Sequence, residues 1–146
     1  MSGNEDNPIT PRGPSLRALL QAVVRIPSVT PGDRSVSDHP TYGEGRLAQF
    51  AASFMRDCGL TPKVHDVHPE RPAVWARLDA GRDKTVLLQA HLDTVEPDWA
   101  DADPFSGEER GGFIHGRGAC DCKASLAVFL DACAPRLAPP NACDTT

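Results

Sequence analysis

The sequence predicts an α/β fold, in which helices pack against a sheet. Two segments before residue 60 carry apolar residues at helical spacing, and three segments after them have strand patterns, at 62–67, 73–78 and 85–93. The third of these contains the continuous apolar run Val86-Leu87-Leu88, which is typical of a strand covered on both faces. Two helices followed by such strands indicate a sheet that lies between helix layers.

Two amphipathic helices are expected at the start of the domain. Ser15 can cap the first, whose apolar stripe ends before Pro27 (Leu16, Leu19, Leu20, Val23 and Val24). The second begins at Glu44, and Gly59 is a natural stop for its stripe (Leu47, Phe50, Ala51, Phe54, Met55 and Cys58). Both stripes predict core faces. The intervening "SVTPGDRSVSDHP" has the composition of a loop.

A hairpin and a third helix are expected after the strands. Turn residues Gly111-Gly112 separate two short apolar stretches in "DPFSGEERGGFIHGRG", which predicts a hairpin. The hairpin leads into "GRGACDCKASLAVFL" at 116–130, and a helix is predicted from about Cys122 to Cys133. The domain is therefore expected at 15–134, with a disordered start at 1–14 and a proline-rich irregular tail at 135–146.

Composition excludes several classes of function. A chain of 146 residues with a net charge of -5 has the length of one domain and no basic surface for nucleic acid. It has neither a polybasic membrane patch nor a run of about 18 apolar residues, and the acidic first residues do not look like a signal peptide. A cytoplasmic location is expected. Five cysteines are an odd number, which disfavours a disulfide framework.

The first candidate site is "AHLDTV", with His91 and Asp93 at the carboxyl end of the predicted strand 85–93. Ligands of open α/β sheets bind beyond the carboxyl ends of strands. A histidine there can bind a divalent metal through one ring nitrogen, while a carboxylate orients the ring through the other. Residues two apart on a strand share a face, so Asp93 can reach the same site. A strand that ends in a polar turn capped by Asp93 fits these residues equally.

The second candidate is Asp121. Gly116 and Gly118 permit a backbone path that other residues cannot take, and an acid at a helix start is favoured by the helix dipole whether or not it has a function. A carboxylate has two oxygens, so Asp121 can also bridge two metal ions about 3.5–4 Å apart. A plain helix start and a metal bridge both remain open.

The cysteines offer a competing site. Cys120 and Cys122, with His115 and His91, could form a tetrahedral zinc site. Structural zinc sites usually draw on paired cysteines, and no second pair lies at a useful distance in this sequence. Small, partly apolar side chains that fill a crowded turn are the favoured interpretation of Cys120 and Cys122.

Three motifs in order, "VLLQAHLDTV", "DWADADPFSG" and "GRGACDCKASLAVFL", resemble the amino-terminal part of the co-catalytic zinc metallopeptidase and amidohydrolase family. That family includes acetylornithine deacetylase, succinyl-diaminopimelate desuccinylase, aminoacylase and glutamate-type carboxypeptidases. Upstream, "LLQAVVRIPSVTP" and "GEGRLAQF" resemble its first two helices, so the resemblance covers roughly residues 15–132.

The resemblance implies part of a three-layer α/β/α catalytic domain with a mixed sheet, without the family's inserted dimerisation domain. By position, His91 matches a metal ligand, Asp93 the carboxylate that supports it, and Asp121 the carboxylate that bridges two ions. It implies zinc, with cobalt as a possible substitute, and hydrolysis of the amide bond of an N-acyl amino acid or a peptide. It further implies that the peptide bond after Asp121 is cis.

The sequence also departs from the family pattern. The family's catalytic glutamate and its remaining metal ligands belong after Asp121, and the adjacent Glu108 and Glu109 precede it. The expected function is therefore that of a truncated or frame-shifted hydrolase, inactive as this chain. The alternatives are a non-catalytic zinc-binding module that uses His91, Cys120, Asp121 and Cys122, and a folded remnant with only an interaction role. Substrate identity and oligomeric state are not set by these residues.

Overall fold

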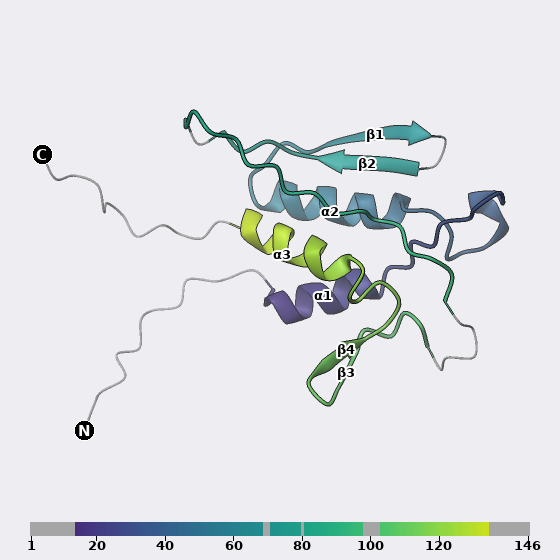
Figure 1. Cartoon of the computed structure of the whole chain (residues 1–146). Helices are drawn as coiled ribbons and strands as arrows, with labels where there is room; N and C mark the ends of the chain where they lie inside the picture. The colour runs from purple at the N-terminus through teal and green to yellow at the C-terminus, as the bar shows by residue number, and fades with distance from the viewer. Residues whose placement is uncertain (1–13, 69–70, 80, 98–102, 135–146) are drawn as a thin grey trace, which may run out of the picture.

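The computed structural model describes residues 14–68, 71–79, 81–97 and 103–134, which form a small α/β structure (Figure 1). Residues 1–13 of the expected disordered start, and the expected irregular tail at 135–146, lie outside this part of the chain. The described elements, in chain order, are α1 (Leu16–Val24), the 3-10 turn η1 (Val36–Asp38), α2 (Gly45–Asp57), β1 (Lys63–His68), β2 (Arg71–Trp75), β3 (Glu108–Arg110), β4 (Phe113–His115) and α3 (Lys123–Cys133).

The helices begin and end where local chemistry predicts. The Ser15 hydroxyl accepts a hydrogen bond from the backbone N–H of Ala18 at 3.2 Å, which caps α1. Gly59, with φ of 82°, provides the left-handed residue that stops α2. The third predicted helix begins one residue later than expected, at Lys123. All three helix predictions are confirmed.

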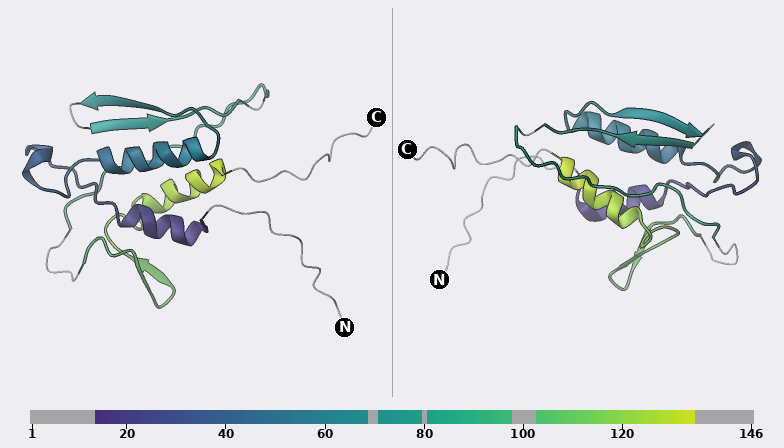
Figure 2. Two further views of the ribbon diagram at one scale, coloured as in Figure 1. Left: turned by 180° about the vertical axis from the view of Figure 1, so that it is seen from behind. Right: turned by 45° about the horizontal axis from the view of Figure 1, so that its top comes forward.

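The core lies where α3 packs against both α1 and α2 (Figure 2). Its fully or almost fully buried apolar side chains are Leu19 and Val23 from α1, Leu47 and Ala51 from α2, and Leu126, Ala127 and Leu130 from α3. These residues come from the helical stripes of the sequence, and burial of each large side chain stabilises the fold by about 1.5–3 kcal/mol. The core therefore holds the start of α3 against the rest of the domain.

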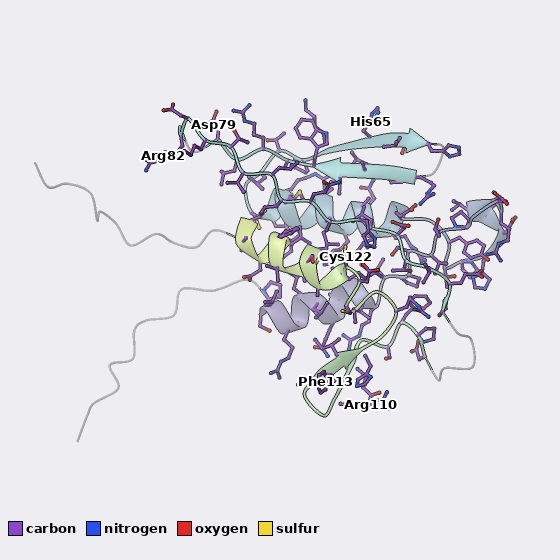
Figure 3. The ribbon with its side chains drawn as sticks, viewed as in Figure 1. His65, Asp79, Arg82, Arg110, Phe113 and Cys122 are labelled. Atoms are coloured by element: carbon purple, nitrogen blue, oxygen red, sulfur yellow. The ribbon has the colours of Figure 1, made fainter. Side chains whose placement is uncertain are left out.

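Two small antiparallel sheets lie on opposite sides of the helices (Figure 1). Strands β1 and β2 pair with Val64 opposite Val74, and they pack on α2. Strands β3 and β4 form the hairpin expected around Gly111-Gly112, with Arg110 opposite Phe113 (Figure 3). The first two strand predictions and the hairpin prediction are thus confirmed, although β2 ends at Trp75 rather than 78.

The predicted strand at 85–93 is wrong in its pairing and its burial. The segment is extended, but residues 85–93 pair with no other described strand, and the side chains of Val86 and Leu87 are 80% and 83% exposed. It runs beside α3 and β2 (Figure 2), and only its end, at Ala90 and Leu92, packs against the core. Burial on both faces needs neighbouring strands and a second helix layer, and the described residues provide neither at this segment.

The carboxyl end of this segment is nevertheless fixed. The N–H of Thr94 donates to the Ser28 carbonyl at 2.9 Å, and the N–H of Thr30 donates to the Thr94 carbonyl at 2.8 Å. Thr94 thus forms an isolated parallel bridge with Val29, which is fully buried. The residues around Thr94 are consequently held beside the end of α1.

None of the helices in the described ranges is long and apolar enough to cross a membrane.

Two leucine substitutions test which apolar segments stabilise the fold. Leu47→Ala is expected to lower the free energy of unfolding by about 2–5 kcal/mol, because it empties a fully buried position. Leu87→Ala is the matched control and is expected to change it by less than about 0.5 kcal/mol, because that side chain is exposed. Urea unfolding followed by circular dichroism measures both. A loss at Leu87 as large as that at Leu47 would show that the 85–93 segment is buried after all.

Candidate metal centre

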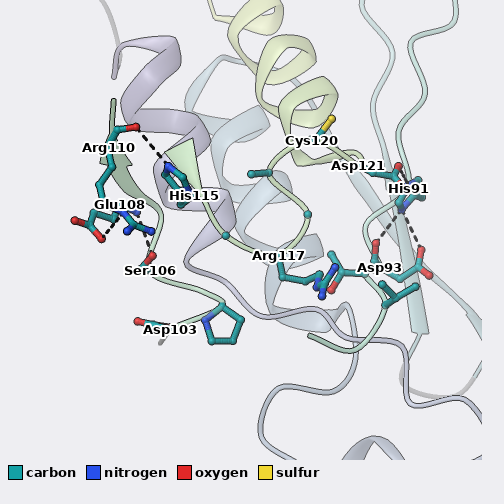
Figure 4. Close-up of a pocket in the computed structure, with 16 residues that line it drawn as sticks. His91, Asp93, Asp103, Ser106, Glu108, Arg110, His115, Arg117, Cys120 and Asp121 are labelled. Carbon is teal, nitrogen blue, oxygen red and sulfur yellow. Dashed lines mark hydrogen bonds and ion pairs between the residues drawn. The ribbon is translucent and has the colours of Figure 1, made fainter. Parts of the chain in front are cut away.

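The two candidate segments of the sequence meet at the start of α3. His91 and Asp93 lie on the extended segment that ends at the Thr94 bridge, and Asp121 lies in the turn just before Lys123 (Figure 4). The structure therefore brings together residues that are 30 positions apart in the sequence. Asp121 also precedes a cis peptide bond, Asp121–Cys122, as the family resemblance implies.

The turn at 116–118 needs its glycines. A Cβ atom on Gly116 would lie 2.5 Å from Val24 Cγ1, and one on Gly118 would lie 2.7 Å from Thr94 Cγ2. Gly118 also has φ of 81°, a conformation that side chains disfavour. The chain can consequently run close to α1 and to the segment that carries His91, which is the backbone path that the glycine spacing predicts.

Lys123 binds the first turn of α3 to the segment that follows α1. Its side chain is almost completely buried, and its Nζ donates to the carbonyl of Ile26 at 2.6 Å. Burial lowers the pKa of this ammonium to about 8. The sequence reasoning missed this contact, because a lysine at a helix start normally indicates a solvated position.

The imidazole of His91 is held at both nitrogens. Nδ1 lies 2.9 Å from the backbone carbonyl of Asp93 and 3.4 Å from its Oδ1, and Nε2 lies 3.0 Å from Oδ1 of Asp121 (Figure 4). A backbone carbonyl only accepts hydrogen bonds, so Nδ1 carries a proton. Nε2 is then the nitrogen that can bind a metal ion when it is not protonated.

The carboxylate of Asp121 raises the pKa of His91. The hydrogen bond from Nε2 to Asp121 is the largest cause, and partial burial of the ring opposes it. The backbone carbonyl and the negative charge of Asp93 act in the same direction as Asp121. In the metal-free protein, the proton on Nε2 therefore occupies the position at which a metal ion would compete.

A thiol completes this group. Single ligand atoms of His91, Asp121 and Cys122 all lie within 4.8 Å of one another. The Cys122 thiol is 3.5 Å from the carbonyl of His91, and burial raises its pKa. Figure 3 places Cys122 at the start of α3. One nitrogen, one carboxylate and one thiol are donors that zinc accepts.

An open cavity of about 600 Å³ adjoins the group (Figure 4). Its wall is formed by the segment around His91, the β3–β4 hairpin and the turn at 116–121. Glu108 lines this wall and pairs with Arg110 at 3.4 Å, whereas Glu109 pairs with Arg17 at 3.2 Å. Neither glutamate belongs to the His91 group among the described residues. A small molecule could reach Asp121 through this cavity.

Residues 87–140 match the family model described as peptidase family M20/M25/M40. A succinyl-diaminopimelate desuccinylase of Bordetella pertussis is 48% identical over 115 residues, which are 77% of this chain and 27% of that protein. The desuccinylase of Methylobacterium sp. is 36% identical over 126 residues, 84% of this chain and 30% of that protein. The match places residues 87–140 of this chain in peptidase family M20.

Other relatives carry the family domain under a broader name. An M20 domain-containing protein of Schizosaccharomyces pombe is 34% identical over 125 residues, 84% of this chain and 27% of that protein. The M20 chain thus spans roughly 30% of the length of the curated relatives that it matches. The family resemblance inferred from the three motifs is confirmed.

The geometry of the M20 chain separates the two cysteines. Cys122 belongs to the three-residue group, whereas Cys120 is exposed and lies outside it. His115 is also outside, with its Nε2 3.4 Å from the Arg110 carbonyl. The tetrahedral site considered from the sequence, with Cys120, Cys122, His115 and His91, is therefore not assembled in the described part of the chain.

The thiols of the M20 chain form no disulfide in the described ranges. Cys58, Cys120, Cys122 and Cys133 are all free, and Cys143 lies outside the described residues.

Sequence reasoning missed two residues behind the site. Arg71, at the start of β2, forms an ion pair with the buried Glu44, and its Nη2 lies 4.0 Å from Oδ2 of Asp93. Glu44 and Arg71 are 27 residues apart on different elements. No sequence spacing connects them, so the contact becomes visible only when β2 packs on α2.

Asp121→Asn is expected to lower the pKa of His91. Asparagine has no negative charge to stabilise the imidazolium, while partial burial continues to favour the neutral ring. NMR titration of the metal-free protein, followed on the His91 ring protons, measures the change. Asp103→Asn is the matched control, because Asp103 lines the same cavity and bonds to the N–H of Phe105. An unchanged His91 pKa in Asp121→Asn would contradict the contact.

Proposed function

We propose that this chain supplies the first part of the active site of an M20-type metal-dependent amide hydrolase. The observation that carries the proposal is the approach of His91 Nε2 to Asp121 Oδ1, at 3.0 Å, on the edge of the cavity. In this proposal His91 and Asp121 are metal ligands and Asp93 is the supporting catalytic carboxylate. Family membership and the desuccinylase relatives support it.

The donor set fits zinc, and cobalt is a suitable substitute. Imidazole nitrogen and carboxylate oxygen are both common zinc ligands. The side chain of Asp121 is 89% exposed, so its carboxylate is open to a second ion on the cavity side, as a bridging role requires. When bound, the ions would polarise the scissile carbonyl and lower the pKa of water.

In the proposed site, the residues of this chain would orient the His91 ring toward the metal and leave space for the substrate. The carbonyl of Asp93 holds the Nδ1 proton of His91, so that Nε2 faces Asp121. The Asp93 carboxylate lies behind the ring at 3.4 Å and strengthens Nε2 as a ligand. The cavity of about 600 Å³ provides space for a small N-acyl amino acid or the end of a peptide.

The same proposal concerns the surrounding domain. We propose that residues 15–134 belong to a three-layer α/β/α catalytic domain with a mixed sheet. The exposed Val86 and Leu87 support this, because an extended apolar segment with bare faces fits a strand that further elements would cover. A cytoplasmic location remains part of the proposal.

We further propose that a polypeptide of these 146 residues does not hydrolyse amides alone. A catalytic zinc site takes about three protein ligands for each ion, and a co-catalytic pair needs more. The described residues offer one metal-ligating group of three, and only His91 and Asp121 in it match the family ligands. We therefore infer that the polypeptide binds one ion weakly.

A cobalt titration tests the ligand assignment. His91→Ala and Asp121→Asn are each expected to weaken Co²⁺ binding at least about 10-fold, because each removes one of few ligands. Cys120→Ser is the control, since this exposed thiol lies outside the group. Isothermal calorimetry measures the affinities. Equal affinity in wild type and His91→Ala would contradict the proposal.

A non-catalytic zinc site is the second candidate function. The specific observation in its favour is that the Cys122 thiol lies within 4.8 Å of the other two ligand atoms. If this site is correct, Cys122→Ser loses binding together with the thiolate-to-cobalt absorption in the near ultraviolet. If Cys122 only packs the turn, Cys122→Ser binds like Cys120→Ser.

An activity assay tests the proposal that this chain does not hydrolyse amides alone. The purified 146-residue chain, loaded with Zn²⁺ or Co²⁺, is expected to release no amine from N-succinyl or N-acetyl amino acids above the rate of the free metal ion. Its Asp121→Asn variant serves as the background control. Turnover that depends on Asp121 would refute the proposed inactivity of this chain while supporting the proposed site.

A further inference from the structure

Side chains of alternating charge run from the buried interior to the candidate metal centre. Glu44 precedes α2, Arg71 begins β2, and Asp93 and His91 follow on the extended segment. Each neighbour in this series lies within ion-pair or hydrogen-bond distance of the next, ending at Asp121. The series therefore connects the start of α2 to the site by way of β2 and the extended segment.

The first link is a fork-shaped ion pair. Arg71 Nε lies 3.0 Å from Oε1 and 3.2 Å from Oε2 of Glu44, and Nη2 also bonds to Oε1. The Glu44 side chain is only 6% exposed. A buried carboxylate of this kind requires a charged partner, and a guanidinium that binds it through two nitrogens has little freedom to turn. Glu44 thus fixes the position of Arg71.

The second link is an electrostatic attraction between Arg71 and Asp93. Nη2 of Arg71 lies 4.0 Å from Oδ2 of Asp93, which is an ion-pair distance and too long for a hydrogen bond. Oδ1 of the same carboxylate lies 3.4 Å from Nδ1 of His91. Asp93 consequently has one oxygen toward Arg71 and the other toward the imidazole. Without the positive charge, this 39%-exposed carboxylate could rotate into solvent.

The electrostatics of Arg71 agree with this arrangement. Its pKa is raised, first by the hydrogen bond to Glu44 and further by the negative charges of Glu44 and Asp93, while burial opposes the shift. The guanidinium therefore interacts favourably with both carboxylates at once.

We propose that Arg71, anchored by Glu44, is a positioning residue that holds the Asp93 carboxylate against His91 and thereby orients His91 Nε2 toward the metal. This inference rests on the proposed function, because it assigns support to the same ligand. Arg71 itself would touch neither the metal nor the substrate. Removal of such outer partners typically lowers metal affinity about 10–100-fold while all ligands remain.

The test uses the full 146-residue chain. Arg71→Met keeps much of the side-chain volume and removes the charge and the fork, and it is expected to weaken Co²⁺ binding about 10-fold or more. Arg77→Met is the matched control, because Arg77 pairs with Asp79 at 3.7 Å on the surface, with a side chain that is 74% exposed. It is expected to bind Co²⁺ like wild type.

A second readout separates positioning from stability. In the metal-free protein, the ¹⁵N shifts of the His91 ring report its tautomer and hydrogen bonding. Arg71→Met is expected to change the Nδ1 signal, while Arg77→Met leaves it unchanged. Arg71→Lys keeps the positive charge but lacks the two-nitrogen contact with Glu44. It is expected to restore part of the Co²⁺ affinity and part of the wild-type Nδ1 shift. A merely structural role would lower the melting temperature and leave the His91 signals of the folded protein unchanged.

The outcomes distinguish this inference from the proposed function. If the wild-type chain binds no Co²⁺, the proposed metal site is wrong. The positioning role is then tested only by the ¹⁵N shifts of the His91 ring in the metal-free protein. If Arg71→Met binds Co²⁺ like wild type and leaves the His91 shifts unchanged, the positioning role is overturned. If Arg71→Met does not fold, Glu44→Gln replaces it in the test. This substitution weakens the Arg71–Glu44 ion pair and is expected to lower the Co²⁺ affinity and to change the His91 ring shifts.

Discussion

The candidate site depends on the close packing of the turn at 116–118 against α1 and the segment that carries His91. Gly116 lies against Val24, and Gly118 lies against both Thr94 and the stem of Lys123. No larger residue fits at these contacts unless the neighbouring side chains shift. Because α3 begins directly after this turn, the core packing of α3 and the position of Asp121 are set together.

The second constraint comes from the Thr94 bridge. Its hydrogen bonds to Ser28 and Thr30 hold the extended segment at one point, immediately after His91 and Asp93. Residues further back, around Leu87, are exposed and form no such backbone bond with the described part of the chain. The segment is thus attached to the rest of the domain next to His91 and Asp93. The site is therefore held in place even though the apolar segment beside it is exposed.

The predictable part of the structure is the part with local signals. Helical stripes, the Ser15 cap, the Gly59 stop and the glycine turn all depend on residues near one another in sequence, and each has its expected form. The exposure of Val86 and Leu87 could not be predicted, because an apolar run shows that a segment favours burial and not whether neighbours cover it. His91 and Asp121 were predicted from their motifs and lie in contact. Glu44 and Arg71 carry no motif, and their role follows only from packing.

We propose that His91 and Asp121 bind one metal ion in common. X-ray absorption of the zinc-loaded chain tests it most directly, because zinc–nitrogen and zinc–oxygen bonds of about 2.0–2.2 Å differ from zinc–sulfur bonds of about 2.3 Å. We expect a shell of nitrogen and oxygen with the scattering of one imidazole, and this imidazole scattering should disappear in His91→Ala. A shell dominated by sulfur, or an imidazole signal that persists in His91→Ala, would contradict it.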